Sequence, residues 1–224
     1  MMLIKFPFNI IAAGTSKSGK SWLIKYLLKT WCQQKKFQAG LVFTGTKFNG
    51  DYTSFLPNEY VLDGFDQKVL LKFMDTLKKL DKRTQEQIDN GAPCMIPHTF
   101  VVFDDILSEM NLQTPIMKQF FSTARHYNMN LFFTTQYIHQ ASPLLRSQAD
   151  YAFLFYHDNK RSIDALYESF GQTFPSERQF KQFLYETTLE QYNAVMYIKE
   201  ERDLKKKFSK VKAPEQMPKI KFKY

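Results

Sequence analysis

The stretch NIIAAGTSKSGKSWLIKYLL, residues 9–28, decides the fold of this chain. A short apolar run leads into a loop of Gly, Ser, Thr and Lys, and apolar residues then recur at helical spacing. Residues 14–21, GTSKSGKS, match the pattern G-x-x-x-x-G-K-[ST] at every constrained position. Because a strand is expected before the loop and a helix after it, the stretch predicts a phosphate-binding loop, or P-loop (Walker A).

Each residue type in this loop suits phosphate binding. Gly14 and Gly19 allow backbone angles and a close approach that a Cβ would block. The intervening N–H groups and the helix N-terminus would surround the β-phosphate. Lys20 should bridge the β- and γ-phosphates, and the Ser21 hydroxyl should bind Mg²⁺. The nucleotide-binding residues are therefore predicted to be Gly14, Thr15, Ser16, Lys17, Ser18, Gly19, Lys20 and Ser21, with the Lys17 side chain interpreted as a loop charge.

A second motif is HTFVVFDDI, residues 98–106, in which four apolar residues lead to two aspartates. At the end of a strand, Asp104 could hold Mg²⁺ through its water shell, which is the Walker B role. Asp105 comes next and is the candidate general base for an attacking water. The alternative is a strand that ends in a turn with two solvated carboxylates.

A third motif is NLFFTTQYIHQ, residues 130–140, another apolar strand with a polar end. The amide of Gln136 could touch the γ-phosphate and orient water, as glutamines do in other NTPases. Strands often end in polar residues, so the position of this motif after the P-loop and the aspartates is what makes it informative.

Apolar segments of two kinds alternate along the chain. Strands are expected at residues 8–13, 40–44, 99–104, 130–136, 151–156 and 192–198, and helices at residues 20–35, 67–90, 114–126, 161–170 and 176–187. Such alternation predicts an α/β fold with a mostly parallel sheet flanked by helices. With the P-loop, this is a P-loop NTPase of the RecA-like (ASCE) class.

The totals favour one domain, residues 1–198, followed by a basic C-terminal tail, residues 199–224. The 224-residue chain has 31 Lys and Arg against 22 Asp and Glu, a net charge of +9, and the tail holds ten of the basic and four of the acidic residues. The first ten residues lack the features of a signal peptide and are interpreted as an edge strand. No apolar run approaches the ~20 residues of a transmembrane helix. Cys32 and Cys94 lack metal-ligand spacing and are expected to be reduced thiols.

The three motifs in this order resemble the FtsK–HerA superfamily of P-loop ATPases. Residues 103–155 closely resemble the poxvirus-type genome-packaging ATPases of large DNA viruses and virophages. The resembling features are the Asp104–Asp105 pair, the ARHYN turn at residues 124–128, the strand-terminal Gln136, and LLRSQADYAFLF at residues 144–155. Overall the resemblance covers about residues 8–156. Many superfamily members have Asp-Glu where this chain has Asp-Asp, which shortens the presumed base by one methylene.

The resemblance implies a parallel sheet in which the strand at residues 130–136 lies between the P-loop and Walker B strands. It also implies an ATPase that uses ATP and Mg²⁺ and pumps double-stranded DNA, without sequence specificity, into a viral capsid. Such proteins form homo-oligomeric rings, pentamers or hexamers, and work in the virion or the host cytoplasm. A neighbouring subunit's arginine would stabilise the transferring phosphate. Arg125, in the ARHYN turn, is the first candidate and Arg146 the second, although each could instead make a structural salt bridge.

DNA contacts would be made by basic residues. The candidates are Lys47, the helix cluster Lys78, Lys79, Lys82 and Arg83, and the tail residues Lys205, Lys206 and Lys207. The helix cluster could equally be a solvated face. Besides DNA, the tail could dock onto capsid or portal vertex proteins or lie on an internal virion membrane.

Two other functions stay open from the sequence. A nucleoside or nucleotide kinase of this size would need an arginine-rich lid, and no such arginine cluster is present in the sequence. A nucleotide-dependent capsid-assembly protein would bind nucleotide and form rings without translocating DNA.

Overall fold

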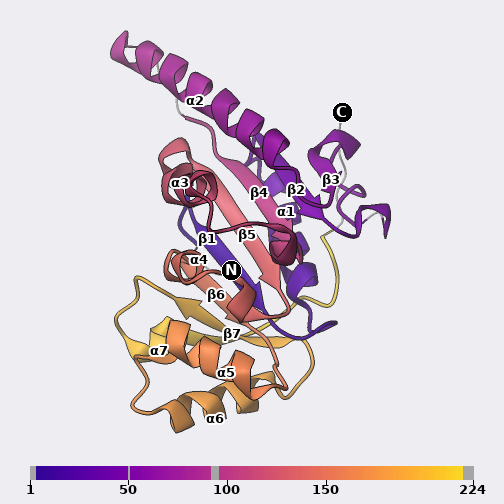
Figure 1. Ribbon diagram of the computed structural model, residues 1–224, viewed down its shortest axis with the longest axis vertical. Coiled ribbons are helices and arrows are strands. Elements are labelled where there is room, and N and C mark those ends of the chain that lie inside the picture. Colours follow the sequence, from indigo (N-terminus) through magenta and orange to yellow (C-terminus); the bar gives the residue numbers. More distant parts are fainter. Residues whose placement is uncertain (1–3, 50, 92–95, 219–224) are drawn as a thin grey trace.

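The strands of the chain form a single mixed sheet. The computed structural model describes residues 4–49, 51–91 and 96–218, and within them the strand order is β3-β2-β4-β5-β1-β6-β7-β8 (Figure 1). The strands are β1 (Asn9–Ala13), β2 (Ala39–Thr44), β3 (Val61–Asp63), β4 (Thr99–Asp104), β5 (Met129–Thr135), β6 (Tyr151–Leu154), β7 (Asn193–Ile198) and β8 (Phe208–Lys212). From β3 to β6 all neighbours are parallel, whereas β7 and β8 are added antiparallel. The predicted α/β class with a mostly parallel sheet is confirmed.

The centre of the sheet holds the three strands that carry the motifs. β5 pairs with β1 on one side and with β4 on the other, so the expected position of the third motif's strand is confirmed. The N-terminal segment was wrongly interpreted as an edge strand, because β1 lies in the interior of the sheet between β5 and β6. Its all-buried sequence NIIAA fits that interior position.

The two edge strands, β3 and β8, were not predicted. β3 has only three residues, too few to show a period. β8 has the sequence FSKVK, in which two lysines alternate with other residues, and its charge made it look like part of a solvated tail. In the structure β8 pairs with β7 from Tyr197 opposite Phe208 to Asn193 opposite Lys212. The described part of the basic segment thus extends the sheet, while the domain boundary placed after residue 198 stays a prediction.

Helices cover both faces of the sheet. They are α1 (Lys20–Gln33), α2 (Gln67–Asp89), α3 (Pro115–Thr123), α4 (Pro143–Ser147), α5 (Lys160–Leu166), α6 (Glu177–Thr188) and α7 (Leu204–Lys207). The start of α6 agrees with its sequence signal, because the Ser176 hydroxyl accepts a hydrogen bond from the Gln179 N–H. Short α4 and α7 were not predicted.

Side chains alternate between two cores because successive strand residues point to opposite faces. On one face, the ring of Phe103 stacks on those of Phe43 and Phe133 at 5.6 and 5.0 Å, and residues of α2, α3, α5 and α6 belong to the same core. On the other face Phe132 packs with Trp31 of α1, at 6.0 Å between rings. The strands that position the motifs are therefore held rigidly from both sides.

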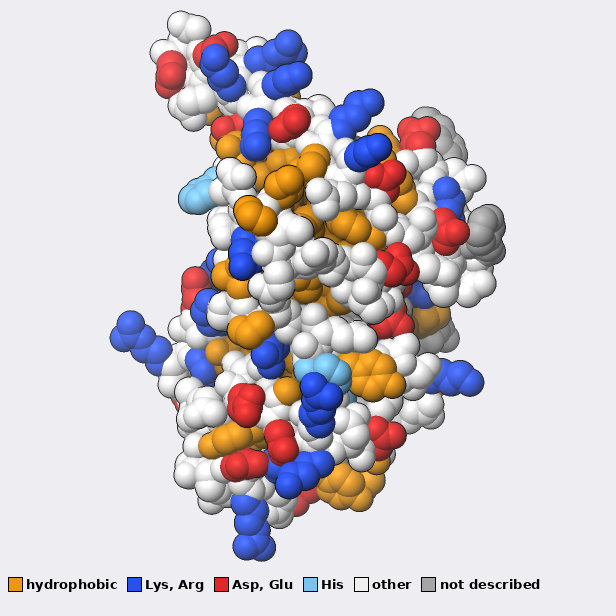
Figure 2. All heavy atoms as spheres, viewed as in Figure 1, with side chains coloured by type: hydrophobic (Ala, Val, Ile, Leu, Met, Phe, Trp, Pro, Cys, Tyr) orange, Lys and Arg blue, Asp and Glu red, His pale blue; other side chains and the backbone are white. Residues whose placement is uncertain are grey.

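Helix α2 projects beyond the sheet (Figure 1). Its buried apolar residues Leu70, Met74 and Leu77 lie in the first half, and beyond them most residues are exposed apart from buried Thr84. Figure 2 shows basic and acidic side chains together on the projecting end. None of the helices within the described residues has the length and apolar character needed to cross a membrane.

One of the two cysteines lies within the described residues. Cys32, on α1, is a free thiol whose pKa is raised by burial to about 12. Cys94 lies outside the described residues.

Candidate nucleotide-binding site

The site lies at the carboxyl ends of three neighbouring parallel strands, β4, β5 and β1. The P-loop follows β1, Asp104 is the last residue of β4, and Gln136 follows β5. The register places Ala13 opposite Thr135 and Asp104 opposite Thr134. Parallel strands present their carboxyl ends together, which is where ligands bind in open α/β sheets.

The P-loop is anchored on both flanks. Its first N–H, of Gly14, donates to the carbonyl of Thr135 at 3.2 Å, and the Thr15 N–H donates to the carbonyl of Tyr156 at 3.0 Å. A Cβ on Gly14 would lie 2.5 Å from the Cβ of Phe155, so only glycine fits. Gly19 has a φ of 105°, in the left-handed region that suits glycine. The loop is therefore held in one shape by its neighbours.

Lys20 is directed into the site. It is only 6% exposed, and its Nζ donates to the carbonyl of Thr15 at 2.8 Å, across the mouth of the loop. Burial lowers the pKa of Lys20, and the nearby carboxylates of Asp105 and Asp104 act in the opposite direction. The ammonium thus lies between the loop carbonyl and both aspartates, where a phosphate chain would find it.

Asp104 is the most heavily bonded group of the site. Its Oδ1 accepts hydrogen bonds from the hydroxyls of Ser21, at 2.7 Å, and Thr134, at 2.5 Å. Its Oδ2 accepts one from the hydroxyl of Tyr52 at 3.0 Å. Ser21 and Asp104 are both oxygen donors of the kind Mg²⁺ prefers, and they converge from two elements. A Mg²⁺ ion held by one or two protein oxygens and by phosphate fits this donor set.

Asp105 and Gln136 form a second pair beside the first. The Gln136 amide Nε2 donates to Oδ2 of Asp105, and the Asp105 N–H donates to the Thr134 hydroxyl at 2.9 Å. Asp105 has a φ of 57°, an uncommon left-handed conformation for a residue with a side chain. Such strained residues cluster at functional sites. The structure thus brings together the side chains of Lys20, Ser21, Asp104, Asp105 and Gln136, and their catalytic roles stay predictions.

Arg125 lies away from its own P-loop. Its guanidinium pairs with Oδ2 of Asp150 at 2.9 Å and donates to the carbonyl of Gln148 at 2.5 Å. The same Asp150 oxygen accepts the N–H of Asn9, the first residue of β1, at 2.7 Å. Burial raises the pKa of Asp150, while the Asn9 N–H and the Arg125 guanidinium lower it. Arg125 therefore lies at the amino-terminal ends of the strands, whereas the P-loop lies at their carboxyl ends. It forms a structural salt bridge, which was one of the two roles that the sequence allowed.

Arg146, on α4, lines a separate hollow of about 610 Å³ beside α5. Its Nη1 donates to the hydroxyl of Ser169 at 2.9 Å. Burial lowers the pKa of the neighbouring His139, and the charges of Arg161 and Arg146 lower it further. Among the described residues, no hydrogen bond or ion pair joins Arg146 to the P-loop of the same chain.

Two residues that hold Asp104 were missed from the sequence as functional groups. Thr134 could have been found, because the parallel register places it opposite Asp104. Tyr52 belongs to no motif and lies 52 residues before its partner. Its loop is attached to α1 by the ion pair between Asp51 and Lys25, 2.6 Å long. Burial and the charge of Asp104 raise the pKa of Tyr52 well above its ordinary value, so the phenol keeps its proton and donates.

The basic residues proposed to contact DNA divide into two groups. Lys207 was wrongly included, because it is buried and its Nζ donates to the carbonyls of Lys199 and Glu201 at 2.9 and 2.6 Å. Lys205 and Lys206 are exposed, as are the basic residues of α2. These exposed residues remain candidates for backbone contacts.

Comparison with known proteins assigns the chain to a family. Residues 1–162 match the family described as Poxvirus A32 protein. The chain belongs to this family. The resemblance of the sequence to the poxvirus-type proteins is thereby confirmed.

Curated relatives of the chain come from viruses. The chain is 24% identical over 182 residues to uncharacterized protein 075L of Invertebrate iridescent virus 6, covering 80% of this chain and 66% of that protein. It is 25% identical over 184 residues to uncharacterized protein 015R of Frog virus 3, covering 81% of this chain and 52% of that protein. The chain thus spans about half to two thirds of the length of these curated relatives.

Solved structures with the same fold include a viral NTPase and the cytoplasmic domain of EssC. The genome packaging NTPase B204 of Sulfolobus turreted icosahedral virus 2, in complex with ATP-gammaS, has a TM-score of 0.59 at 18% identity, over 87% of this chain and 93% of that one. The cytoplasmic domain of EssC has a TM-score of 0.60 at 14% identity, over 92% of this chain and 39% of that one. At these identities the likeness establishes the P-loop ATPase fold.

Proposed function

We propose that this protein hydrolyses ATP with Mg²⁺ and uses the energy to move double-stranded DNA into a viral capsid. One observation carries the proposal: the Ser21 hydroxyl lies 2.7 Å from the Asp104 carboxylate, next to buried Lys20 and the Asp105–Gln136 pair. The residues proposed to hold the triphosphate, to hold the metal and to act as the base thus lie together at the carboxyl ends of β1, β4 and β5. Membership of the A32 family and the fold of a viral genome packaging NTPase support the biological setting.

The chemistry follows from these side chains. Lys20 and the P-loop N–H groups would hold the β- and γ-phosphates, while Ser21 and Asp104 would hold Mg²⁺, which neutralises charge that develops on the phosphates. Asp105 would take a proton from the water that attacks the γ-phosphorus, as the bond to the β–γ bridging oxygen breaks and ADP leaves. The Gln136 amide donates to Asp105 and would orient that water.

A ring would complete the site in trans. Arg125 and the P-loop lie at opposite ends of the parallel strands, and the Arg125 side chain is 37% exposed. Repeated head-to-tail contacts can close into a pentamer or hexamer. Such a contact can bring the Arg125 end of one subunit against the P-loop end of its neighbour. We therefore keep Arg125 as the first trans candidate and Arg146 as the second. Mixing Arg125→Ala protein with Lys20→Ala protein should restore part of the ATPase activity if the site is shared, whereas no restoration would contradict a trans role.

DNA, the capsid and a membrane are the proposed partners. The net charge of +9 favours contacts with the phosphate backbone that do not depend on sequence. Capsid or portal vertex proteins, and an internal virion membrane, are further surfaces that the basic C-terminal segment could meet. The place of action would be the virion or the assembly site in the host cytoplasm.

The decisive measurement is steady-state ATP hydrolysis with and without double-stranded DNA. Wild-type protein should turn over ATP and be stimulated by DNA, and Lys20→Ala should abolish both. Asp105→Asn should retain ATP binding and lose about 10²- to 10⁴-fold in turnover, the usual contribution of a general base. Phosphorylation of added nucleosides would instead identify a kinase. Ring formation and capsid assembly that stay unchanged in Asp105→Asn, with little ATP turnover in wild type, would identify an assembly protein that does not translocate DNA.

A further inference from the structure

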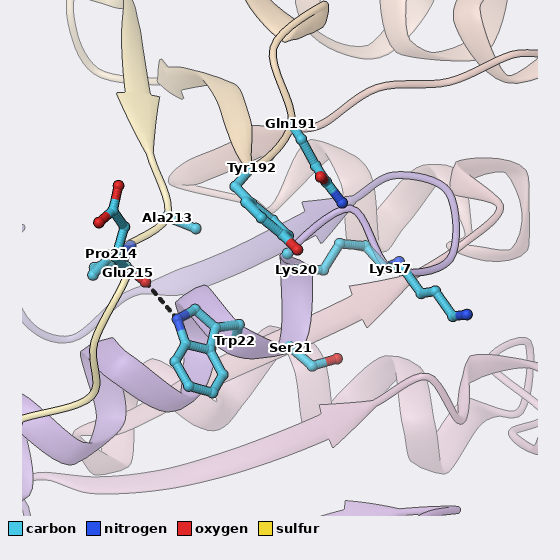
Figure 3. Close-up of a pocket in the computed structure, with 10 residues that line it drawn as sticks. Lys17, Lys20, Ser21, Trp22, Gln191, Tyr192, Ala213, Pro214 and Glu215 are labelled. Carbon is cyan, nitrogen blue, oxygen red and sulfur yellow. Dashed lines mark hydrogen bonds between the residues drawn. The ribbon is translucent and has the colours of Figure 1, made fainter.

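A hollow continues from the P-loop toward the C-terminal segment. It has a volume of about 610 Å³, within the range of small-molecule sites. Its walls come from three places in the chain: Lys17 and residues 19–22 of the P-loop and α1, residues 191–192 before β7, and residues 213–215 after β8. Figure 3 shows the side chains of Trp22, Tyr192 and Pro214 around this space, with Lys20 and Ser21 at its inner side.

The walls are tied together by hydrogen bonds. The indole Nε1 of Trp22 donates to the carbonyl of Pro214 at 2.5 Å (Figure 3). The N–H of Ala213 donates to the carbonyl of Tyr192 at 2.8 Å. Tyr192 has a φ of 70°, and a Cβ built on Gly19 would lie 3.2 Å from its ring. The aromatic residue before β7 is therefore fixed directly against the P-loop glycine.

Two aromatic rings at this hollow are left partly exposed. Trp22 is 39% exposed and Tyr192 is 44% exposed, whereas the second tryptophan, Trp31, is 6% exposed. Flat apolar faces beside a phosphate site suit a nucleobase, because every base has a π-face that stacks on aromatic rings. A second hollow along the P-loop is lined by residues 15–18 together with Tyr156, Tyr185 and Tyr192, and neither Lys20 nor Ser21 lines it. The phosphate-holding end of the loop thus opens into the aromatic hollow.

We propose that this hollow binds the base and ribose of the nucleoside triphosphate, with Trp22, Tyr192 and Pro214 as the contact surfaces for the base. This inference rests on the proposed ATPase function and extends it to a part of the nucleotide that no motif in the sequence addresses. It also makes residues 213–215, from the basic C-terminal segment, a wall of the nucleotide site. A bound base would touch both the start of α1 and the chain that follows β8.

The test compares ATP with inorganic tripolyphosphate, which has the phosphates and lacks the nucleoside. Binding of each, with Mg²⁺, is measured by titration calorimetry for wild type, Trp22→Leu, Tyr192→Leu and the control Ile116→Ala, an exposed apolar residue on α3. The two pocket variants should bind ATP about 5- to 150-fold more weakly, which corresponds to ~1–3 kcal/mol of base stacking. Their affinity for tripolyphosphate should stay within about twofold of wild type, which also shows that they are folded.

A second readout uses the tryptophans. In Trp31→Phe protein, Trp22 is the only tryptophan left, since the chain has two. Its fluorescence should change on addition of ATP and stay constant with tripolyphosphate. Equal losses for both ligands, or unchanged ATP binding in the pocket variants, would overturn the base site and leave the proposed function standing. If wild-type protein binds neither ligand, both proposals fail.

Discussion

Tyr52 and Asp104 are joined by a hydrogen bond, 3.0 Å from the phenol oxygen to Oδ2. The bond fixes the carboxylate that is proposed to hold the metal, from a loop that has no motif of its own. Ser21 and Thr134 share the other carboxylate oxygen, so the two oxygens are oriented from different elements. Partners of this kind orient metal ligands and tune them.

Replacing Tyr52 by Phe tests this role. The change removes the hydroxyl and keeps the ring, which packs in the core beside Phe55. We expect ATP turnover to fall, or the Mg²⁺ concentration needed for half-maximal turnover to rise, by about 10- to 100-fold. This is the usual cost of losing such a partner. ATPase assays over a Mg²⁺ series measure both quantities. Tyr60→Phe, at the end of a short helical turn in the same loop, is the matched control, and an equal effect in both variants would contradict the assignment.

Replacing Gly14 by Ala tests the fit of the P-loop. The added Cβ would lie 2.5 Å from Phe155 and 2.7 Å from the Ser18 hydroxyl, so the loop must shift. Overpacking of this kind costs about 1–3 kcal/mol, and nucleotide binding should weaken with it. Denaturant unfolding and ATP titration measure the two effects. At Gly45 a Cβ would meet nothing within 4 Å, so Gly45→Ala should leave both unchanged.

Replacing Arg125 by Ala tests its structural role separately from any role in trans. Asp150 would lose its guanidinium partner, and the free energy of unfolding should fall by about 1–3 kcal/mol at neutral pH. The pKa of Asp150 is already raised by burial, and loss of Arg125 would raise it further. Between the unfolded and folded pKa values the folded state binds more protons, so stability falls as pH rises through that window.

The destabilisation by Arg125→Ala should therefore be full at pH values above the folded pKa of Asp150 and shrink as the pH falls through it. Urea unfolding at neutral and at mildly acidic pH measures this difference. Arg178→Ala, an exposed arginine on α6, is the control. A loss of stability that is independent of pH would contradict the account.

Replacing Phe208 by Ala tests whether the start of β8 belongs to the folded domain. Phe208 is 5% exposed, and its ring lies 4.8 Å from that of Phe174 and 5.4 Å from that of Tyr197. Truncation of a buried phenylalanine costs about 3–5 kcal/mol. Thermal and chemical unfolding should show this loss, while Lys210→Ala, at an exposed residue of β8, should be nearly neutral. Equal stability of the two variants would indicate that this segment lies outside the folded domain.

The central part of the site could be predicted from the sequence because its signals are local. The P-loop, Asp104, Asp105 and Gln136 each follow an apolar strand, and parallel strands end together, so their meeting required no knowledge of distant contacts. The register then places Asp104 opposite Thr134. Lys207 shows the limit of this reasoning, because a lysine in a basic run looks solvated until the carbonyls that bury it are known.

The sequence alone determined the class of fold and the P-loop motif, since these depend on spacing within short segments. Only the tertiary structure decided that Tyr52 reaches Asp104, that Arg125 pairs with Asp150 at the far edge, and that Trp22 meets Pro214. Trp22 and Pro214 are 192 residues apart in the chain. Contacts between such distant segments are set by how whole elements pack, and a local pattern of residue types does not encode them.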